Sequence, residues 1–131
     1  MIPHVFHRIW IGDAPIPAEY ERYARTWLDL HPGWVMHTWT NDTMFATNYP
    51  GLVKACRELR HASNIYRYEI LRALGGVYVD VDFECRKNIE PLLEGKTFVT
   101  AAQNDDITPL GYLNPAFFAC EAGHRTMNRL V

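Results

Sequence analysis

One stretch of the chain, residues 62–83, constrains the fold more than any other. Residues 62–74 have the apolar spacing of an amphipathic helix, and the Gly75-Gly76 pair that follows is typical of a helix end. Residues 77–83 then alternate strictly, as a β-strand does. The two predicted faces of this strand differ, with Val77, Val79, Val81 and Phe83 on one and Tyr78, Asp80 and Asp82 on the other. We therefore expect a helix that turns tightly into a strand.

The rest of the chain continues this alternation of helical and extended segments. We predict strands at 3–11, 34–40, 97–102 and 113–119, and helices that begin at Pro17, run over 50–61 and run over 123–131. Asn41 to Thr43 could cap a short helix. His4 and His7 have an odd offset in the first strand, which favours structural or solvent-facing histidines over a shared metal site. The pattern indicates an α/β fold.

Composition bounds the class of protein. The chain has 131 residues and a net charge of −2, so we expect a single domain over 1–131 and no nucleic-acid partner. Residues Cys56, Cys85 and Cys120 are widely spaced and odd in number, which favours free thiols in a reducing compartment. No apolar run approaches the ~20 residues of a membrane span, and the start of the chain lacks a secretory leader. These features predict a cytoplasmic location.

The aspartate pair is the first candidate for chemistry. Asp80 and Asp82 share a predicted strand face, about 6.5–7 Å apart along the strand. Two carboxylates so placed at a strand end can hold a hard divalent cation. The alternative is the polar outer face of a half-exposed strand, because this tripeptide pattern is common.

The preceding helix adds a charge where apolar residues are expected. Tyr66, Ile70, Leu71 and Leu74 form its apolar stripe, and Arg67 projects onto the same stripe. A buried guanidinium keeps its charge and needs partners. We expect those partners to be the carboxylates of the following strand or the polar groups of a ligand. A purely structural salt bridge, or a guanidinium that reaches solvent, is the competing interpretation.

These residues together resemble a known family. The pattern A-S-N-x-x-R-Y-x-x-L-x-x-x-G-G-V-Y-x-D-x-D over residues 62–82 resembles the glycosyltransferases that contain a DXD motif. That group includes fungal outer-chain mannosyltransferases, with the glucosyltransferase domains of clostridial toxins as relatives. The segments at 2–12 and 114–124 are similar to the first strand and to the asparagine-containing segment of that family. The resemblance implies a GT-A-like fold with a mixed central sheet flanked by helices, here short at the C-terminal end.

The resemblance also implies roles for particular residues. Trp10 would stack on a nucleotide base, with the backbone of Ile11 and Gly12 lining that pocket; its alternative is a core tryptophan. Tyr78 is a further candidate at the donor site, and Arg67 would contact the donor sugar or its diphosphate. Asp80 would reach the ribose or sugar and share the metal, and Asp82 would ligate the metal directly. Asn64 stands where the family usually has aspartate, which removes a charge and a strong acceptor for sugar hydroxyls.

The implied activity is metal-dependent transfer of a sugar, with Mn²⁺ or Mg²⁺, from a UDP- or GDP-sugar to a glycan or other acceptor. Retention of the anomeric configuration would follow, with Arg67, Asp80 and Asp82 as the catalytic set. Two alternatives stay open. A short chain could bind nucleotide sugar without turnover or serve as an interaction module, with apolar surface that favours a homo-oligomer. A phosphoryl hydrolase could use the same aspartates with Glu84, Asp105 and Asp106, which otherwise read as loop charges.

Overall fold

The computed structural model describes residues 1–41, 43, 59–102 and 113–130. Their helices and strands alternate along the chain, as expected for an α/β fold. In chain order they are β1 (Val5–Ile9), α1 (Ala18–Leu30), β2 (Val35–Trp39), α3 (Leu59–Leu74), β3 (Gly76–Val79), α4 (Glu90–Leu93), β4 (Phe98–Ala102), β5 (Leu113–Cys120) and α5 (Arg125–Leu130). Of the helix predicted over 50–61, the last three residues belong to α3, and the rest lies outside the described residues.

The strands form one mixed sheet in the order β2-β1-β3-β5-β4. Strands β1, β2 and β3 run parallel, β5 runs antiparallel to β3, and β4 runs antiparallel to β5. The carboxyl ends of β1, β2 and β3 therefore meet at one edge of the sheet. In open α/β sheets this edge is where ligands usually bind.

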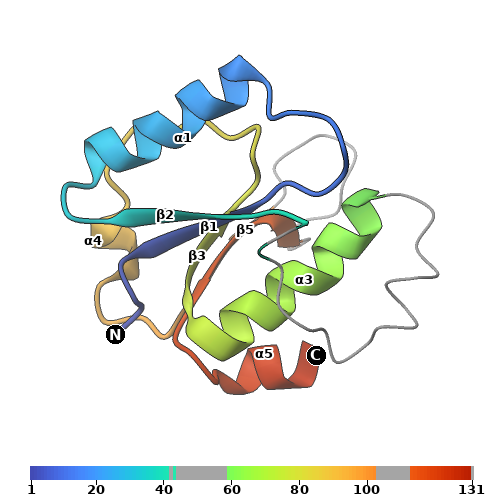
Figure 1. Cartoon of the computed structure of the whole chain (residues 1–131). Coiled ribbons are helices and arrows are strands. Elements are labelled where there is room, and N and C mark those ends of the chain that lie inside the picture. The colour runs from blue at the N-terminus through green and yellow to red at the C-terminus, as the bar shows by residue number, and fades with distance from the viewer. Residues whose placement is uncertain (42, 44–58, 103–112, 131) are drawn as a thin grey trace.

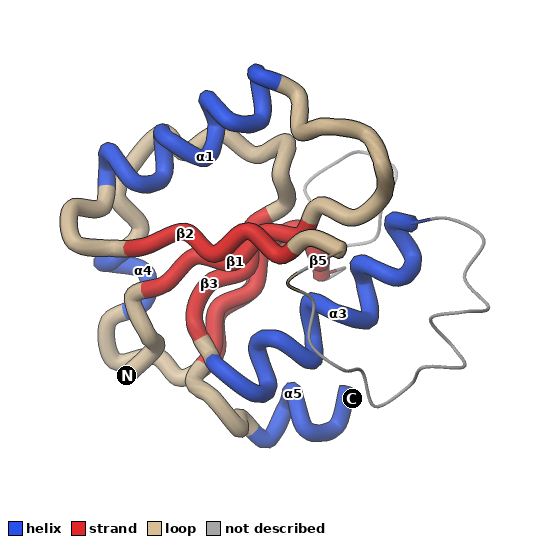
Figure 2. Tube along the Cα trace, in the orientation of Figure 1, coloured by secondary structure: helices blue, strands red, loops and turns tan. Residues whose placement is uncertain are grey.

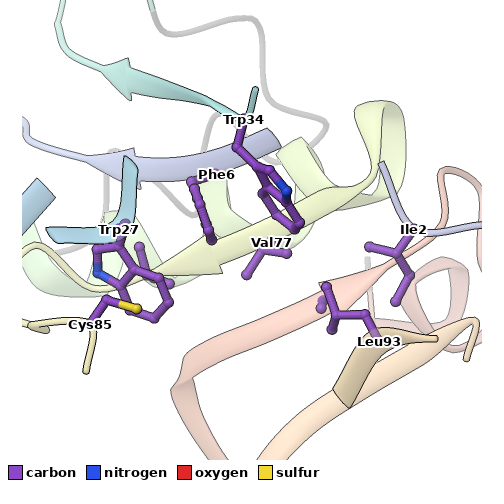
Figure 3. Close-up of a cluster of buried hydrophobic side chains, with 9 residues drawn as sticks. Ile2, Phe6, Trp27, Trp34, Val77, Cys85 and Leu93 are labelled. Carbon is purple, nitrogen blue, oxygen red and sulfur yellow. The ribbon is translucent and has the colours of Figure 1, made fainter. Parts of the chain in front are cut away.

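Helices cover both faces of the sheet. Helix α1 lies on one face, and α3 and α5 lie on the other (Figure 1, Figure 2). Beneath α1, Phe6 of β1 packs between Trp27 and Trp34, with ring centroids 5.1 and 4.5 Å away, above Val77 of β3 (Figure 3). Between the sheet and α3 and α5 lies a second cluster of buried side chains, which are Ile9, Ile70, Leu71, Tyr78, Phe118, Cys120 and Met127. Hydrophobic burial on both faces fixes the sheet between its helices.

The two glycines between α3 and β3 make the tight turn that the sequence predicts. Gly75 has φ +67° and donates its N–H to Leu71 O at 2.9 Å, which closes the helix. Gly76 has φ +111°, and a Cβ there would lie 2.7 Å from Val5 O. Any side chain at this position would collide with the neighbouring strand, so β3 begins only because the residue is glycine.

The strand predicted over 77–83 is shorter than expected. Strand β3 ends at Val79, and a turn follows in which Phe83 N–H donates to Asp80 O at 3.1 Å. Pairing between β1 and β3 stops at Tyr78, and the last ladder bond to β5 is from Asp80 N–H to Ala116 O. The alternation continues in the sequence, but the backbone beyond has lost its strand neighbours. Residues 81–83 therefore lie in this turn and not in the predicted strand, and Val81, predicted on the face opposite to the aspartates, lines the same cleft as Asp80 and Asp82.

The sequence also made predictions about Leu74, about the cysteines and about membrane-spanning segments. Leu74, placed on the apolar stripe of α3, is 45% exposed because it lies at the end of that helix. Cys85 and Cys120 are buried free thiols, whereas Cys56 lies outside the described residues. None of the described helices is long and apolar enough to cross a membrane.

Candidate functional site

A cleft of about 510 Å³ lies at the carboxyl edge of β1 and β3. This volume falls in the range of small-molecule sites. Its walls come from the loop after β1, the start of α1, one face of α3 and the end of β3. The residues lining it are Ile9, Trp10, Ile11, Gly12, Asp13, Ala14, Tyr20, Ser63, Arg67, Tyr78, Asp80, Val81 and Asp82. The structure thus brings together every residue to which the resemblance assigned a role, apart from Asn64.

Arg67 lies on the core-facing stripe of α3, as predicted, and its side chain is 6% exposed. Its Nη2 is 3.3 Å from Asp80 Oδ1, and its guanidinium lies 4.4 Å from the centre of the Tyr78 ring. Nη1 donates to Pro115 O, and Nε is 3.5 Å from Ser63 O. The buried charge therefore has a carboxylate, a π face and backbone carbonyls as partners, which a buried guanidinium requires.

Asp80 is held by one of its two carboxylate oxygens. Oδ1 accepts the Tyr78 hydroxyl at 2.8 Å and the Arg67 guanidinium. Among the described residues, no partner contacts Oδ2. Burial raises the pKa of the Asp80 carboxyl above its usual value, and Arg67 and the Tyr78 hydroxyl oppose that shift. Burial also raises the pKa of the Tyr78 phenol, so Tyr78 stays a neutral donor. The arrangement orients Asp80 and leaves one oxygen for a ligand.

Asp82 lies two residues further on, in the turn that follows β3, and is exposed. Its negative charge contributes to raising the pKa of Asp80, so the two carboxylates are close enough to interact. The described part of the chain contains no group of three or more His, Cys, Asp or Glu that could hold a metal by itself. Two carboxylates can still suffice for Mg²⁺ when water and substrate phosphates complete the coordination.

Trp10 lines the same cleft and is only half-buried, so it is not a core tryptophan. Its indole Nε1 donates to Ala14 O at 2.8 Å, which folds the loop after β1 back on the ring. Tyr20 of α1 meets it edge to face, with ring centroids 6.1 Å apart. The indole is therefore fixed in orientation beside open space, which suits stacking on a planar ligand.

Asn64 and His124, both in segments that resemble the family, do not line this cleft. Asn64 follows Ser63 on α3 and is half-buried, but it is not one of the described residues that line the cleft. The backbone of Asn114 belongs to β5, and its side chain lies outside the described ones. His124 contacts Thr97 Oγ1 at 3.2 Å, beside the end of β5 that pairs with the start of β3. His124 is therefore at the opposite edge of the sheet from Asp80.

Two contributors to the site were not predicted. Tyr20 of α1 was not singled out as a site residue, yet it lines the cleft. Pro115 presents its carbonyl to Arg67 from β5, whose pairing with β4 shifts in register between Thr100 and Ala101 of β4. A proline inside a strand indicates a bulge, and that signal was present in the sequence.

Comparison with known proteins agrees with this geometry. Residues 17–99 match the family described as "Glycosyltransferase sugar-binding region containing DXD motif". An uncharacterized glycosyltransferase of Acanthamoeba polyphaga mimivirus is 33% identical over 122 residues, which cover 87% of this chain and 48% of that protein. Inositol phosphoceramide mannosyltransferase 1 of Schizosaccharomyces pombe is 31% identical, over 90% of this chain and 38% of that protein.

A solved structure, the PaToxG glycosyltransferase, superposes with a TM-score of 0.73 at 15% identity, over 97% of this chain and 58% of that chain. This likeness confirms the expected GT-A-like fold. The chain spans about half the length, or less, of the viral and the yeast relative. The family match covers Arg67, Asp80 and Asp82 together. The chain belongs to the family of glycosyltransferase sugar-binding regions that contain a DXD motif.

Proposed function

We propose that residues 1–131 form one nucleotide-sugar-binding unit of a metal-dependent glycosyltransferase. The donor would be a UDP- or GDP-sugar, the acceptor a glycan or another hydroxyl compound, and the anomeric configuration would be retained. The observation that carries this proposal is the cleft that Trp10 lines together with the anchored Arg67–Asp80 pair. The names of the relatives as glycosyltransferases support the same reaction class.

The donor atoms at the cleft fit a hard divalent cation. Oδ2 of Asp80 and the exposed carboxylate of Asp82 would hold Mn²⁺ or Mg²⁺, both of which prefer oxygen ligands. When bound, such an ion stabilises the negative charge that develops on the nucleoside diphosphate leaving group. Because Arg67 and Tyr78 both act on Oδ1, they orient the carboxylate without occupying its second oxygen.

The remaining roles follow from where each side chain lies. Trp10 would stack on the base, and the backbone of Ile11 and Gly12 would line the same pocket. Arg67 would add fixed positive charge in a partly desolvated wall, where charge stabilisation is stronger than in water. Asn64, which follows Ser63 on α3 but does not itself line the cleft, would contact the donor sugar.

A phosphoryl hydrolase finds less support. Two-metal hydrolysis needs several carboxylates around one point. Glu84 is exposed and lies 3.7 Å from Arg86, and Asp105 and Asp106 lie outside the described residues. The described carboxylates at the cleft are Asp13, Asp80 and Asp82, and they do not cluster as a two-metal centre would require.

Calorimetric titration with UDP, GDP and their hexose conjugates tests the proposal, in Mn²⁺, in Mg²⁺ and in EDTA. We expect binding that EDTA and the Asp82→Ala variant both remove, while the exposed Asp29→Ala variant binds as the parent does. The proposal is overturned if no conjugate binds in a metal-dependent manner. Donor hydrolysis or transfer to an acceptor would then separate an enzyme from a binding module, and cleavage of a phosphodiester would favour the hydrolase.

A further inference from the structure

The loop that carries Trp10 and Gly12 is tied to the end of β2 by a side chain outside the cleft. Strands β1 and β2 pair in parallel register up to Ile9 and Trp39. One more backbone bond follows, from Trp10 N–H to Trp39 O at 2.8 Å. Beyond this bond, the side-chain carboxamide of Asn41, and not the backbone of β2, pairs with the loop. Gly12 N–H donates to Asn41 Oδ1 at 3.1 Å, and Asn41 Nδ2 donates to Gly12 O at 3.0 Å.

This side chain imitates a strand neighbour. In a parallel ladder, alternate residues of one strand bond through both N–H and C=O to the adjacent strand. Trp10 and Gly12 are two residues apart, so the carboxamide supplies the next rung after the backbone pairing has stopped. Gly12 has φ +115°, a conformation that other residues rarely adopt, and its backbone lines the cleft. Both polar groups of Gly12 are thereby fixed by one residue.

The two hydrogen bonds between Asn41 and Gly12, called the Asn41 clamp below, hold a loop whose ordering would otherwise cost conformational entropy. Asp13, Ala14 and Pro15 are exposed, and the described contacts that hold this loop include the Asn41 pair and the bond from Trp10 Nε1 to Ala14 O. A binding loop that is ordered before the ligand arrives avoids the entropy cost of ordering on binding. Asn41 does not itself line the cleft, so any effect on the ligand passes through Gly12 and Trp10.

We propose that Asn41 is a positioning residue for the nucleotide pocket, which it preorganises through its two hydrogen bonds to Gly12. The inference rests on the proposed function only in naming the ligand. The existence of the clamp can be measured without any ligand.

Asn88 provides a matched control. It is an exposed asparagine that also bridges loops, with Nδ2 donating to Leu30 O at 2.9 Å and Oδ1 accepting Glu90 N–H at 2.8 Å. It does not line the cleft. The variants Asn41→Ala, Asn41→Asp and Asn88→Ala would be compared with the parent. The measurements are amide hydrogen exchange at Gly12 without ligand, the dissociation constants of UDP and GDP with Mn²⁺, and the melting temperature.

We expect Asn41→Ala to speed exchange at Gly12 about tenfold or more and to weaken UDP or GDP binding about three- to tenfold. Its melting temperature should change no more than that of Asn88→Ala, which should bind nucleotide as the parent does. Asn41→Asp keeps the acceptor for Gly12 N–H but loses the donor, so its affinity should fall between those of the parent and Asn41→Ala.

If the Asn41→Ala variant exchanges the Gly12 amide hydrogen at the same rate as the parent, Asn41 does not hold the Gly12 backbone in place and the proposal is overturned. Faster exchange with unchanged nucleotide affinity would overturn its role in binding. If the parent binds neither UDP nor GDP, the proposed function fails and the nucleotide role of Asn41 fails with it, whereas the exchange rate still decides whether the clamp exists.

Discussion

Arg67 and Asp80 form an ion pair of 3.3 Å in which the two partners are buried to different degrees. The guanidinium side chain is 6% exposed, and the carboxylate side chain is 30% exposed. Arg67 also contacts Pro115 O and the Tyr78 ring, whereas the described contacts of the Asp80 carboxylate use Oδ1 alone. The guanidinium of Arg67 is thus buried in the protein, whereas the carboxylate of Asp80 is partly accessible from the cleft. This asymmetry separates the contribution of each residue to stability from its contribution to binding.

The pair should respond unequally to loss of either charge. Arg67→Met removes the ion pair and the contact with the Tyr78 ring, and it leaves Pro115 O without its described donor, so we expect a loss of about 3–5 kcal/mol in unfolding free energy. Asp80→Asn leaves Arg67 its carbonyl partners and should cost only about 1–2 kcal/mol. Urea denaturation measures both. A larger loss for Asp80→Asn would contradict this asymmetry.

Asp82 should matter for binding and hardly at all for stability. It is exposed, in a turn, and no described residue donates to it. Asp82→Asn should therefore change the unfolding free energy by less than about 0.5 kcal/mol, as for other surface substitutions. If Asp82 holds a metal, the same change should weaken Mn²⁺-dependent nucleotide binding more than about tenfold. Calorimetry checks the affinity, with the exposed Asp29→Asn as control. If Asp82→Asn and Asp29→Asn bind the nucleotide with equal affinity in Mn²⁺, Asp82 is not a metal ligand.

Trp10 should contribute through its ring face. Base–aromatic stacking is worth about 1–3 kcal/mol, so Trp10→Ala should weaken UDP or GDP binding roughly 5- to 150-fold. Trp10→Phe keeps a ring but loses the N–H that bonds Ala14 O, so its affinity should lie between those of Trp10→Ala and the parent. Titration of all three proteins with each nucleotide tests this order. A Trp10→Phe variant as weak as Trp10→Ala would assign the effect to loop order instead of stacking.

The pairing of Arg67 with Asp80 could be predicted from the sequence because it follows from local periodicity and one energetic rule. The helix spacing put the guanidinium on the buried stripe, and a buried charge needs a partner on the next element. The Gly75-Gly76 turn was equally readable, since glycine after a helical pattern is typical of a helix end.

What could not be predicted depends on contacts between segments far apart in the chain. Strand β3 ends at Val79 although the alternation continues, because its pairing with β1 stops at Tyr78 and its last bond to β5 is made by Asp80 N–H. The carbonyl of Pro115 reaches Arg67 through a register shift between β4 and β5. The Asn41 carboxamide meets Gly12 only because β1 and β2 lie side by side. Periodicity along one segment carries no information about where its neighbours stop.

Gly76 should tolerate substitution far less than Gly95. Both residues have positive φ, +111° and +68°, so an alanine at either position is strained by about 1–2 kcal/mol. A Cβ at Gly76 would also lie 2.7 Å from Val5 O and 3.0 Å from His7 Nε2, whereas a Cβ at Gly95 has nothing within 4 Å. Gly76→Ala should therefore cost at least about 1–3 kcal/mol more than Gly95→Ala in denaturant unfolding. Equal losses would mean that strain alone, and not the close strand, requires glycine at residue 76.

His7 should make the stability of the protein fall at mildly acidic pH. The ring is buried; Nε2 donates to Gly75 O at 2.9 Å, and Nδ1 accepts the Trp39 indole N–H at 3.1 Å. Burial lowers the pKa of His7 from 6.5 to about 4. The folded state therefore binds fewer protons than the unfolded state between these values, and stability rises with pH across that window.

This contribution is complete above about pH 6.5 and is lost progressively as the pH falls towards 4, by about 3 kcal/mol in all. His7→Gln can still donate to Gly75 O but does not titrate, so the difference in unfolding free energy between parent and variant should shrink or reverse as the pH falls from 7 to 4. The exposed His37→Gln should keep most of the pH dependence of the parent. Urea denaturation at a series of pH values measures all three proteins. Parallel curves for the parent and His7→Gln would show that His7 is not buried in its neutral form.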